Sequence, residues 1–177
     1  MNNDLAVAGS SRPIEKASDP SHCLPRHAAR TLGAPQEACE TSPVSDEVFD
    51  LSTNPAHLGL GARVERLGAF DGSPDWYVRY GEAHVDDGLE GRLVSMHAFD
   101  TSWDTWEMHP NGDELVLCVL GEITLHQEIA DARRTVTLRE GEAVINPPGA
   151  WHTADIDAPA TAVFITAGTG TQIRPRE

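Results

Sequence analysis

The chain has 177 residues, of which 40% are hydrophobic, and this length and composition allow one domain of ordinary size. Its formal net charge of −15 argues against nucleic acid or an anionic membrane surface as a partner. No apolar run approaches the roughly 20 residues that span a bilayer, and the first residues lack the pattern of a signal peptide. Because the three cysteines are widely spaced and form no disulfide framework, we expect a cytoplasmic protein.

Residues 1–45 differ from the rest of the chain. They contain five prolines and few large apolar side chains, which show no period. Such a segment cannot bury enough apolar surface to offset the entropy of ordering it. We therefore predict a disordered tail over residues 1–45 and one domain over residues 46–177. Within that domain, residues 46–72 carry scattered apolar side chains that we expect to cover an edge of a later sheet.

A short helix is predicted next. Ser73 suits the N-cap, Pro74 suits the first turn, and the charge of Asp75 favours the positive end of a helix. Gly88 is expected to end this helix, which should pack over the wall of the domain. Three aromatic residues form its apolar stripe at helical spacing: Trp76, Tyr77 and Tyr80.

From Leu93 onward, short runs rich in Val, Ile, Leu, Thr and Trp alternate with turn signals. Asn111-Gly112 is a strong hairpin signal, and a Pro-Pro-Gly sequence marks a later break. Eight short strands at such spacing predict an all-β antiparallel sandwich or jelly roll. We place the strands at residues 93–99, 102–109, 113–120, 122–129, 133–139, 142–146, 151–156 and 160–167.

Four residues in this region are candidate metal ligands. Glu107 and His109 are two positions apart in a predicted strand, so their side chains project to the same face. Glu114 follows after a hairpin connection and can reach the same side. Because these groups would be costly to bury on an inner face without compensation, we predict a divalent cation between them. His152, just after the Pro-Pro-Gly turn, is the expected fourth ligand.

The first part of this pattern resembles the first motif of the cupin family. The chain has Glu107 and His109 separated by one residue, then four residues, Glu114, six residues and Gly121. Glu107 stands where the family usually has a histidine. This departure affects the charge and the role of the position.

The second cupin motif is matched through its histidine. Gly141 is followed by five residues, by Pro147 and Gly149 one residue apart, and by His152 after two more residues. The two motifs together cover about residues 91–168, under half of the chain. The resemblance implies a double-stranded β-helix, also called a cupin jelly-roll barrel, with one bound metal ion. It also implies a homodimer paired through sheet edges, which would protect those edges.

The role of Glu107 has two interpretations. As a ligand it completes a set of two histidines and two carboxylates, which neutralises a divalent cation and favours Fe²⁺ or Mn²⁺, with Zn²⁺ or Ni²⁺ as alternatives. As a general base it would stand beside a site of three ligands. In a further interpretation no metal binds, and the four residues hydrogen-bond one another.

The alternation of strand side chains predicts the surroundings of the site. If Glu114 points inward, Val116, Cys118 and Leu120 share its face, and the cysteine is a small buried apolar residue. His126 is expected at the surface. Two histidines outside the motifs are interpreted as ordinary polar residues: His57 and His84.

Other residues are placed near the mouth of the predicted barrel. His97 is one of them, and either His97 or Glu107 is a candidate for moving a proton during catalysis. Three tryptophans are further candidates for lining a substrate pocket: Trp103, Trp106 and Trp151.

The resemblance does not select one reaction, since one fold supports many functions. We expect first a metal-dependent oxidoreductase of the dioxygenase type, in which Fe²⁺ keeps positions open for O₂ and a small-molecule substrate. The alternative is a non-redox isomerase, lyase or decarboxylase acting on a sugar or keto acid. A second alternative is a non-catalytic module that binds a metabolite.

Overall fold

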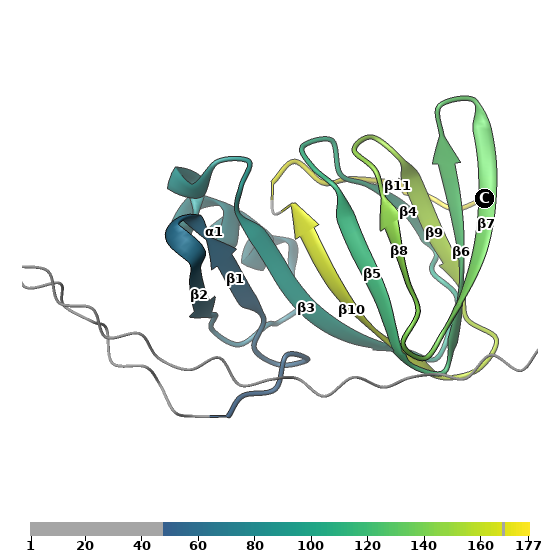
Figure 1. Ribbon diagram of the computed structural model, residues 1–177, viewed down its shortest axis with the longest axis horizontal. Coiled ribbons are helices and arrows are strands. Elements are labelled where there is room, and N and C mark those ends of the chain that lie inside the picture. Colours follow the sequence, from purple (N-terminus) through teal and green to yellow (C-terminus); the bar gives the residue numbers. More distant parts are fainter. Residues whose placement is uncertain (1–47, 168) are drawn as a thin grey trace, which may run out of the picture. The chain divides into compact units, whose positions relative to one another are not determined.

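The computed structural model describes residues 48–167 and 169–177 (Figure 1). The predicted tail and the first two residues of the predicted domain lie outside the described residues. The strands form two antiparallel sheets, one of six strands and one of five, which pack face to face. The predicted all-β double-sheet jelly roll is confirmed. Among the described residues, no helix combines the length and the apolar character that crossing a bilayer requires.

Six strands make the first sheet: β1 (Ala56–Gly59), β2 (Arg63–Arg66), β3 (Arg92–Phe99), β5 (Glu114–Leu120), β8 (Ala143–Asn146) and β10 (Ala160–Ala167). Their order across the sheet is β2-β1-β3-β10-β5-β8. The residues expected to cover a sheet edge instead extend the sheet, because β1 pairs with β3 through backbone hydrogen bonds. The sequence pattern did not predict β1 and β2, because both strands are short and every residue of β2 is exposed.

Five strands make the second sheet: β4 (Thr105–Met108), β6 (Glu122–Ile129), β7 (Ala132–Arg139), β9 (Trp151–Asp155) and β11 (Gln172–Pro175). Their order is β11-β4-β9-β6-β7. Strand β4 begins three residues later than predicted, because the preceding residues form a loop whose Trp103 N–H donates to the Ala154 carbonyl at 3.0 Å. Strand β11 was not predicted, since its exposed residues show no alternation.

The predicted helix is α1 (Pro74–Ala83), and its start is confirmed by the Ser73 hydroxyl, which accepts from the Trp76 N–H at 3.2 Å. Its end is earlier than predicted. A short 3-10 helix, η2 (Val85–Asp87), follows, and Gly88 ends that helix with a φ of 55°, which favours glycine. A second 3-10 helix, η1 (Leu60–Ala62), connects β1 to β2. The buried side of α1 packs into a small apolar cluster: Leu67, Trp76, Tyr80 and Leu93.

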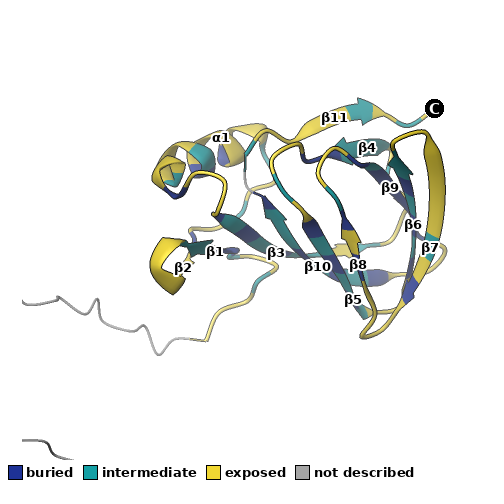
Figure 2. Ribbon diagram, turned by 45° about the horizontal axis from the view of Figure 1, so that its top comes forward, coloured by how far each residue is buried: buried dark blue, intermediate teal, exposed yellow. Residues whose placement is uncertain are grey.

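The main core lies between the two sheets, where buried positions alternate with less buried ones along the strands (Figure 2). Val116 and Cys118 are fully buried there, as predicted, but Leu120 is 58% exposed. The reason is a β-bulge. Cys118 pairs with Ala162, and the next pair is Leu120 with Thr161. Strand β5 therefore has two residues where β10 has one. The bulge reverses the alternation of faces at the end of the strand.

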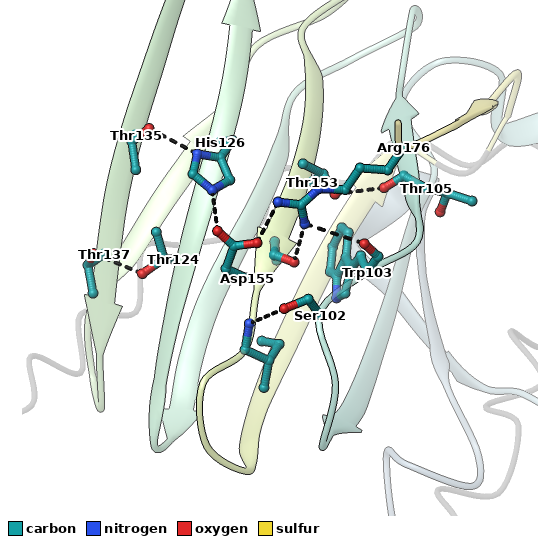
Figure 3. A network of polar contacts seen from close by, with 12 residues as sticks. Ser102, Trp103, Thr105, Thr124, His126, Thr135, Thr137, Thr153, Asp155 and Arg176 are labelled. Carbon is teal, nitrogen blue, oxygen red and sulfur yellow. Dashed lines mark hydrogen bonds and ion pairs between the residues drawn. The ribbon is translucent and has the colours of Figure 1, made fainter.

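The outer face of the second sheet carries a polar network (Figure 3). The His126 ring contacts the Thr135 hydroxyl at 2.9 Å and the Asp155 carboxylate at 2.7 Å. The Arg176 guanidinium bonds to the other oxygen of Asp155 and to the Ala154 carbonyl. His126 is therefore on the outer face, as expected, and this network anchors the residues after β11 to the sheet.

A second polar cluster joins β1 to the helical segment, and His57 is at its centre. The ring of His57 is 1% exposed, and its nitrogens contact the Tyr80 hydroxyl at 2.9 Å and the Asp87 carboxylate at 2.7 Å. The Arg63 guanidinium donates to the same carboxylate at 2.8 Å, and the His84 ring lies 3.9 Å from the His57 ring. The two histidines, interpreted from the sequence as ordinary polar residues, lie outside the candidate metal group and belong to this polar cluster.

Candidate metal centre

Three of the four candidate ligands lie together on the second sheet. Glu107 is on β4 and is the cross-strand partner of His152 on β9, while His109 follows the end of β4. One ligand atom from each of the three lies within 4.8 Å of the others, and the two imidazole centroids are 5.3 Å apart. The structure thus brings together residues that the sequence places 45 positions apart.

The fourth candidate, Glu114, reaches the group from the facing sheet. One of its oxygens lies 3.3 Å from Nε2 of His109, and the other lies 3.1 Å from Nε2 of His152. Two ligand atoms that each bind one ion at about 2.1 Å, at roughly right angles, are about 3 Å apart. The separations around Glu114 therefore fit ligands of a common cation.

The Nε2 atoms of His109 and His152 are buried and have no hydrogen-bond partner among the described residues. The opposite nitrogen of His152 faces the Ala150 carbonyl at 3.2 Å, so Nδ1 carries the proton and donates. In the neutral ring, the lone pair of Nε2 then faces a carboxylate, an arrangement that repels unless a positive charge lies between them. His109 is oriented in a comparable way by the Thr171 hydroxyl, 2.9 Å from its Nδ1. The residues present fit a bound cation.

Glu114 is held in place by two further side chains. The Asn146 amide donates to one carboxylate oxygen at 2.9 Å, and the Thr166 hydroxyl donates to the other at 2.7 Å. The Gln127 amide in turn donates to the Asn146 side-chain oxygen at 2.5 Å. These residues belong to no motif, and only the pairing register could have revealed them, since Asn146 is the cross-strand partner of Glu114.

The pKa values follow from these contacts. Burial works to raise the pKa of Glu114, but the contacts with His109 and His152 outweigh it and hold the pKa far below its ordinary value. Burial likewise works to lower the pKa of His152, and the Glu114 carboxylate outweighs it, so that pKa is raised. Both shifts show an environment that favours positive charge next to Glu114.

Glu107 differs from the other three candidates. It is only partly buried, and it makes no hydrogen bond or ion pair among the described residues. Burial raises the pKa of this carboxyl, and the charge of Glu114 raises it further. The same Glu107 charge adds to burial in raising the pKa of Tyr77 on α1. Glu107 therefore lies near Tyr77 of α1.

His97 is on β3, outside the group of candidate ligands. Its ring lies 5.7 Å from that of Phe164 and 5.4 Å from that of Phe70. Burial lowers the pKa of this imidazole, so it is neutral at physiological pH.

The three tryptophans divide between the two faces of the second sheet. Trp103 is next to the centre, with its ring 6.2 Å from that of His152. Trp106 and Trp151 lie on the opposite face, where the Arg174 guanidinium is 5.1 and 4.5 Å from their ring centroids. The expectation that these two line the pocket is wrong, because each is adjacent in sequence to an inward-facing residue.

The sequence matches no protein-family model, and no curated protein is significantly similar to it. Its fold resembles that of solved structures. A cupin-2 domain protein from Shewanella frigidimarina is 19% identical with a TM-score of 0.35, over 48% of this chain and 71% of that one. Hydroquinone 1,2-dioxygenase from Sphingomonas sp. TTNP3 is 18% identical with a TM-score of 0.37, over 42% of this chain and 58% of that one. An oxalate oxidase is 18% identical with a TM-score of 0.41, over 45% and 44%.

The chain has a cupin fold. This assignment rests on the two antiparallel sheets and on the positions of the motif residues Glu107, His109 and His152, whose ligand atoms lie within 4.8 Å of one another. The chain spans only about half of the length of the two enzymes named above. Their activities are therefore not assigned to this chain.

Proposed function

We propose that the chain binds one divalent cation through Glu107, His109, Glu114 and His152. The observation that carries this proposal is the convergence of two buried imidazole Nε2 atoms on the two oxygens of one buried carboxylate, at 3.3 and 3.1 Å. Two imidazoles and two carboxylates suit Fe²⁺ or Mn²⁺, although Zn²⁺ and Ni²⁺ bind the same donor types.

The function that this donor set supports best is a metal-dependent oxidoreductase of the dioxygenase type. When bound, Fe²⁺ would supply coordination positions for O₂ and for a small-molecule substrate. The chain's own residues orient the donors, exclude water and handle protons. His97, whose pKa is lowered by burial, is a candidate for moving a proton, and Glu107 is a candidate for the same role if it does not bind the ion.

The test begins with purification of the full chain without oxygen, followed by metal analysis. We expect about one equivalent of iron or manganese, which the matched variant His126→Ala should retain because His126 lies on the outer face. Substrate-dependent oxygen uptake with Fe²⁺ would support the dioxygenase proposal. A wild-type protein that takes up none of the four metals would overturn the metal centre itself.

A non-redox isomerase, lyase or decarboxylase acting on a sugar or keto acid is the second candidate. It is favoured by the Glu107 carboxylate, which has no hydrogen-bond partner among the described residues and is available as a base. Turnover that is unchanged without oxygen would select this candidate. Glu107→His separates the two roles of the residue, because it should keep or strengthen metal binding if Glu107 is a ligand. Outright loss of metal would count against that role.

A further inference from the structure

Residues 169–177 contact the candidate metal centre at one end and the outer face of the five-stranded sheet at the other. They include β11, which pairs with β4 at the edge of that sheet. Three of the four residues of β11 are exposed, and Ile173 is 62% exposed, so the strand buries little apolar surface. Its backbone pairing and the polar contacts of its side chains therefore hold this segment to the sheet.

The inner contact of the segment is with the candidate ligand His109. The hydroxyl of Thr171, just before β11, lies 2.9 Å from Nδ1 of His109, and the ring is 5% exposed. Nε2 of the same ring faces Glu114 at 3.3 Å. If Nε2 binds the ion, Nδ1 carries the proton and donates to the Thr171 hydroxyl, which fixes the angle of the ring. At the same end of the segment, the Asn111 amide donates to the Thr169 carbonyl at 3.1 Å.

The first outer contact is made by Arg174 on β11. Its guanidinium lies 5.1 Å from the ring centroid of Trp106 on β4 and 4.5 Å from that of Trp151 on β9. The same group donates to the Glu128 carboxylate on β6 at 2.5 Å. The side chain of Arg174 therefore extends from β11 across two strands to a third. A guanidinium that lies over aromatic rings and also pairs with a carboxylate attaches more firmly than an exposed ion pair does.

Arg176 makes a second outer contact two residues further along the chain (Figure 3). Its guanidinium bonds to the Asp155 carboxylate and to the Ala154 carbonyl, and its backbone N–H donates to the Asp104 carbonyl at 2.8 Å. Residues 169–177 thus connect two attachments on the outer face of the sheet to one imidazole of the candidate metal centre.

We propose that Thr171 is a positioning residue of the metal centre and that Arg174 controls its position from the opposite face of the sheet. The two residues are three positions apart, and the residues from Gln172 onward pair with β4, so a shift of β11 would also move the Thr171 hydroxyl. Neither residue is a candidate ligand. This inference rests on the proposed metal-binding function, and the wild type is therefore tested for metal binding first.

The first experiment measures metal affinity by calorimetry on the full-length protein, with whichever of Fe²⁺, Mn²⁺, Zn²⁺ and Ni²⁺ binds most tightly. Thr171→Val keeps the shape of the side chain but removes the hydroxyl, and it should lower the affinity about 10-fold or more. Thr171→Ser keeps the hydroxyl and should bind within about threefold of the wild type.

The outcomes separate the two levels of the argument. A wild type that binds none of the four metals would overturn the proposed function. Metal binding by the wild type with an unchanged affinity in Thr171→Val would overturn this inference alone. An equal loss in Thr171→Val and Thr171→Ser would show that the hydroxyl is not what matters, and would also contradict the positioning role.

The second experiment tests the link between the two faces of the sheet. Arg174→Ala should lower metal affinity about fivefold, although Arg174 lies on the outer face. The matched control is Arg133→Ala, because Arg133 pairs with the same Glu128 at 2.7 Å and lies 5.9 Å from the Trp106 ring centroid, but belongs to β7. This control should bind within about twofold of the wild type.

Combining the variants shows whether Arg174 acts through Thr171. The double variant Thr171→Val with Arg174→Ala should bind no more than about twofold less tightly than Thr171→Val alone, because the contact that Arg174 controls is already lost. Losses that multiply, or a loss in Arg133→Ala equal to that in Arg174→Ala, would contradict the link.

Discussion

Among the described residues, two buried groups combine histidine with a carboxylate, and they differ in their hydrogen bonds. Around His57 every polar atom has a partner, because Tyr80 and Asp87 contact the two ring nitrogens and the Leu60 N–H and Arg63 share the carboxylate. Around Glu114 the carboxylate is clamped, but the imidazole nitrogens that face it have no hydrogen bond.

This difference in hydrogen bonding distinguishes a structural group from a candidate binding site more clearly than burial or residue type does. His57 and His152 are 1% and 0% exposed, and their Nε2 atoms lie 2.7 and 3.1 Å from a carboxylate oxygen. A complete set of hydrogen bonds identifies a group that holds the fold together. An incomplete set around well-oriented donors identifies a group that is prepared for a ligand.

The largest expected effect is the loss of metal from the centre. His109→Ala and His152→Ala should each lower the affinity for Fe²⁺ or Zn²⁺ by about 1,000-fold or more, because each removes one ligand of the ion. Calorimetry on the metal-free proteins measures this directly. His57→Ala is the matched control and should bind metal as the wild type does. Full occupancy in both ligand variants would contradict the assignment.

For the free energy of unfolding, the larger effect is expected in the His57 cluster. His57→Ala removes the ring that joins β1, α1 and η2, and it should lower the free energy of unfolding of the metal-free protein by about 3 kcal/mol. Urea unfolding followed by circular dichroism measures the change. His126→Ala, on the outer face, should cost less than about 1 kcal/mol. A comparable loss in both variants would mean that the His57 cluster has no special structural role.

A smaller loss of metal affinity is expected for residues that contact the candidate ligand Glu114 but not the ion. Asn146→Ala removes a hydrogen bond that orients Glu114 and should lower metal affinity by about 10- to 100-fold. Thr166→Val should act in the same direction, whereas Thr166→Ser keeps the hydroxyl and should restore most of the affinity. Wild-type affinity in Asn146→Ala would show that Glu114 is oriented by the ion alone.

The smallest effect concerns the pH dependence of stability. The hydrogen bond with His57, and then that from the Leu60 N–H, lower the pKa of Asp87. The contribution of a carboxylate with a lowered pKa is complete above its unfolded pKa of about 3.9 and is lost as the pH falls through the folded value. The difference in unfolding free energy between the wild type and Asp87→Asn should therefore narrow between about pH 5 and about pH 2. A constant difference would refute this linkage.

The sequence predicted that the candidate ligands lie close together, because their positions follow two local rules. Strand alternation places Glu107 and His109 on one face, and the hairpin returns the chain to Glu114. The motif spacing then adds His152. The same rules explain why the boundaries of β5, β6 and β10 were predicted to within one residue.

What the sequence did not predict depends on pairing between distant segments. Asn146 is 32 residues from Glu114, and Tyr80 and Asp87 are 23 and 30 residues from His57. No local period links such positions, because the register of the sheets decides which of them meet. Leu120 was misplaced for a related reason, since a bulge shifts the register without any mark in the sequence.

The donors of the centre come from both sheets, with Glu114 on the six-stranded sheet and Glu107 and His152 on the five-stranded one. An ion shared by them would tie the two layers together from the inside, as a cross-link does. Separation of the sheets would then require release of the ion. Resistance to heat would rise with the concentration of free metal and fall when a chelator is added, so that metal supply would govern the lifetime of the protein as well as its chemistry.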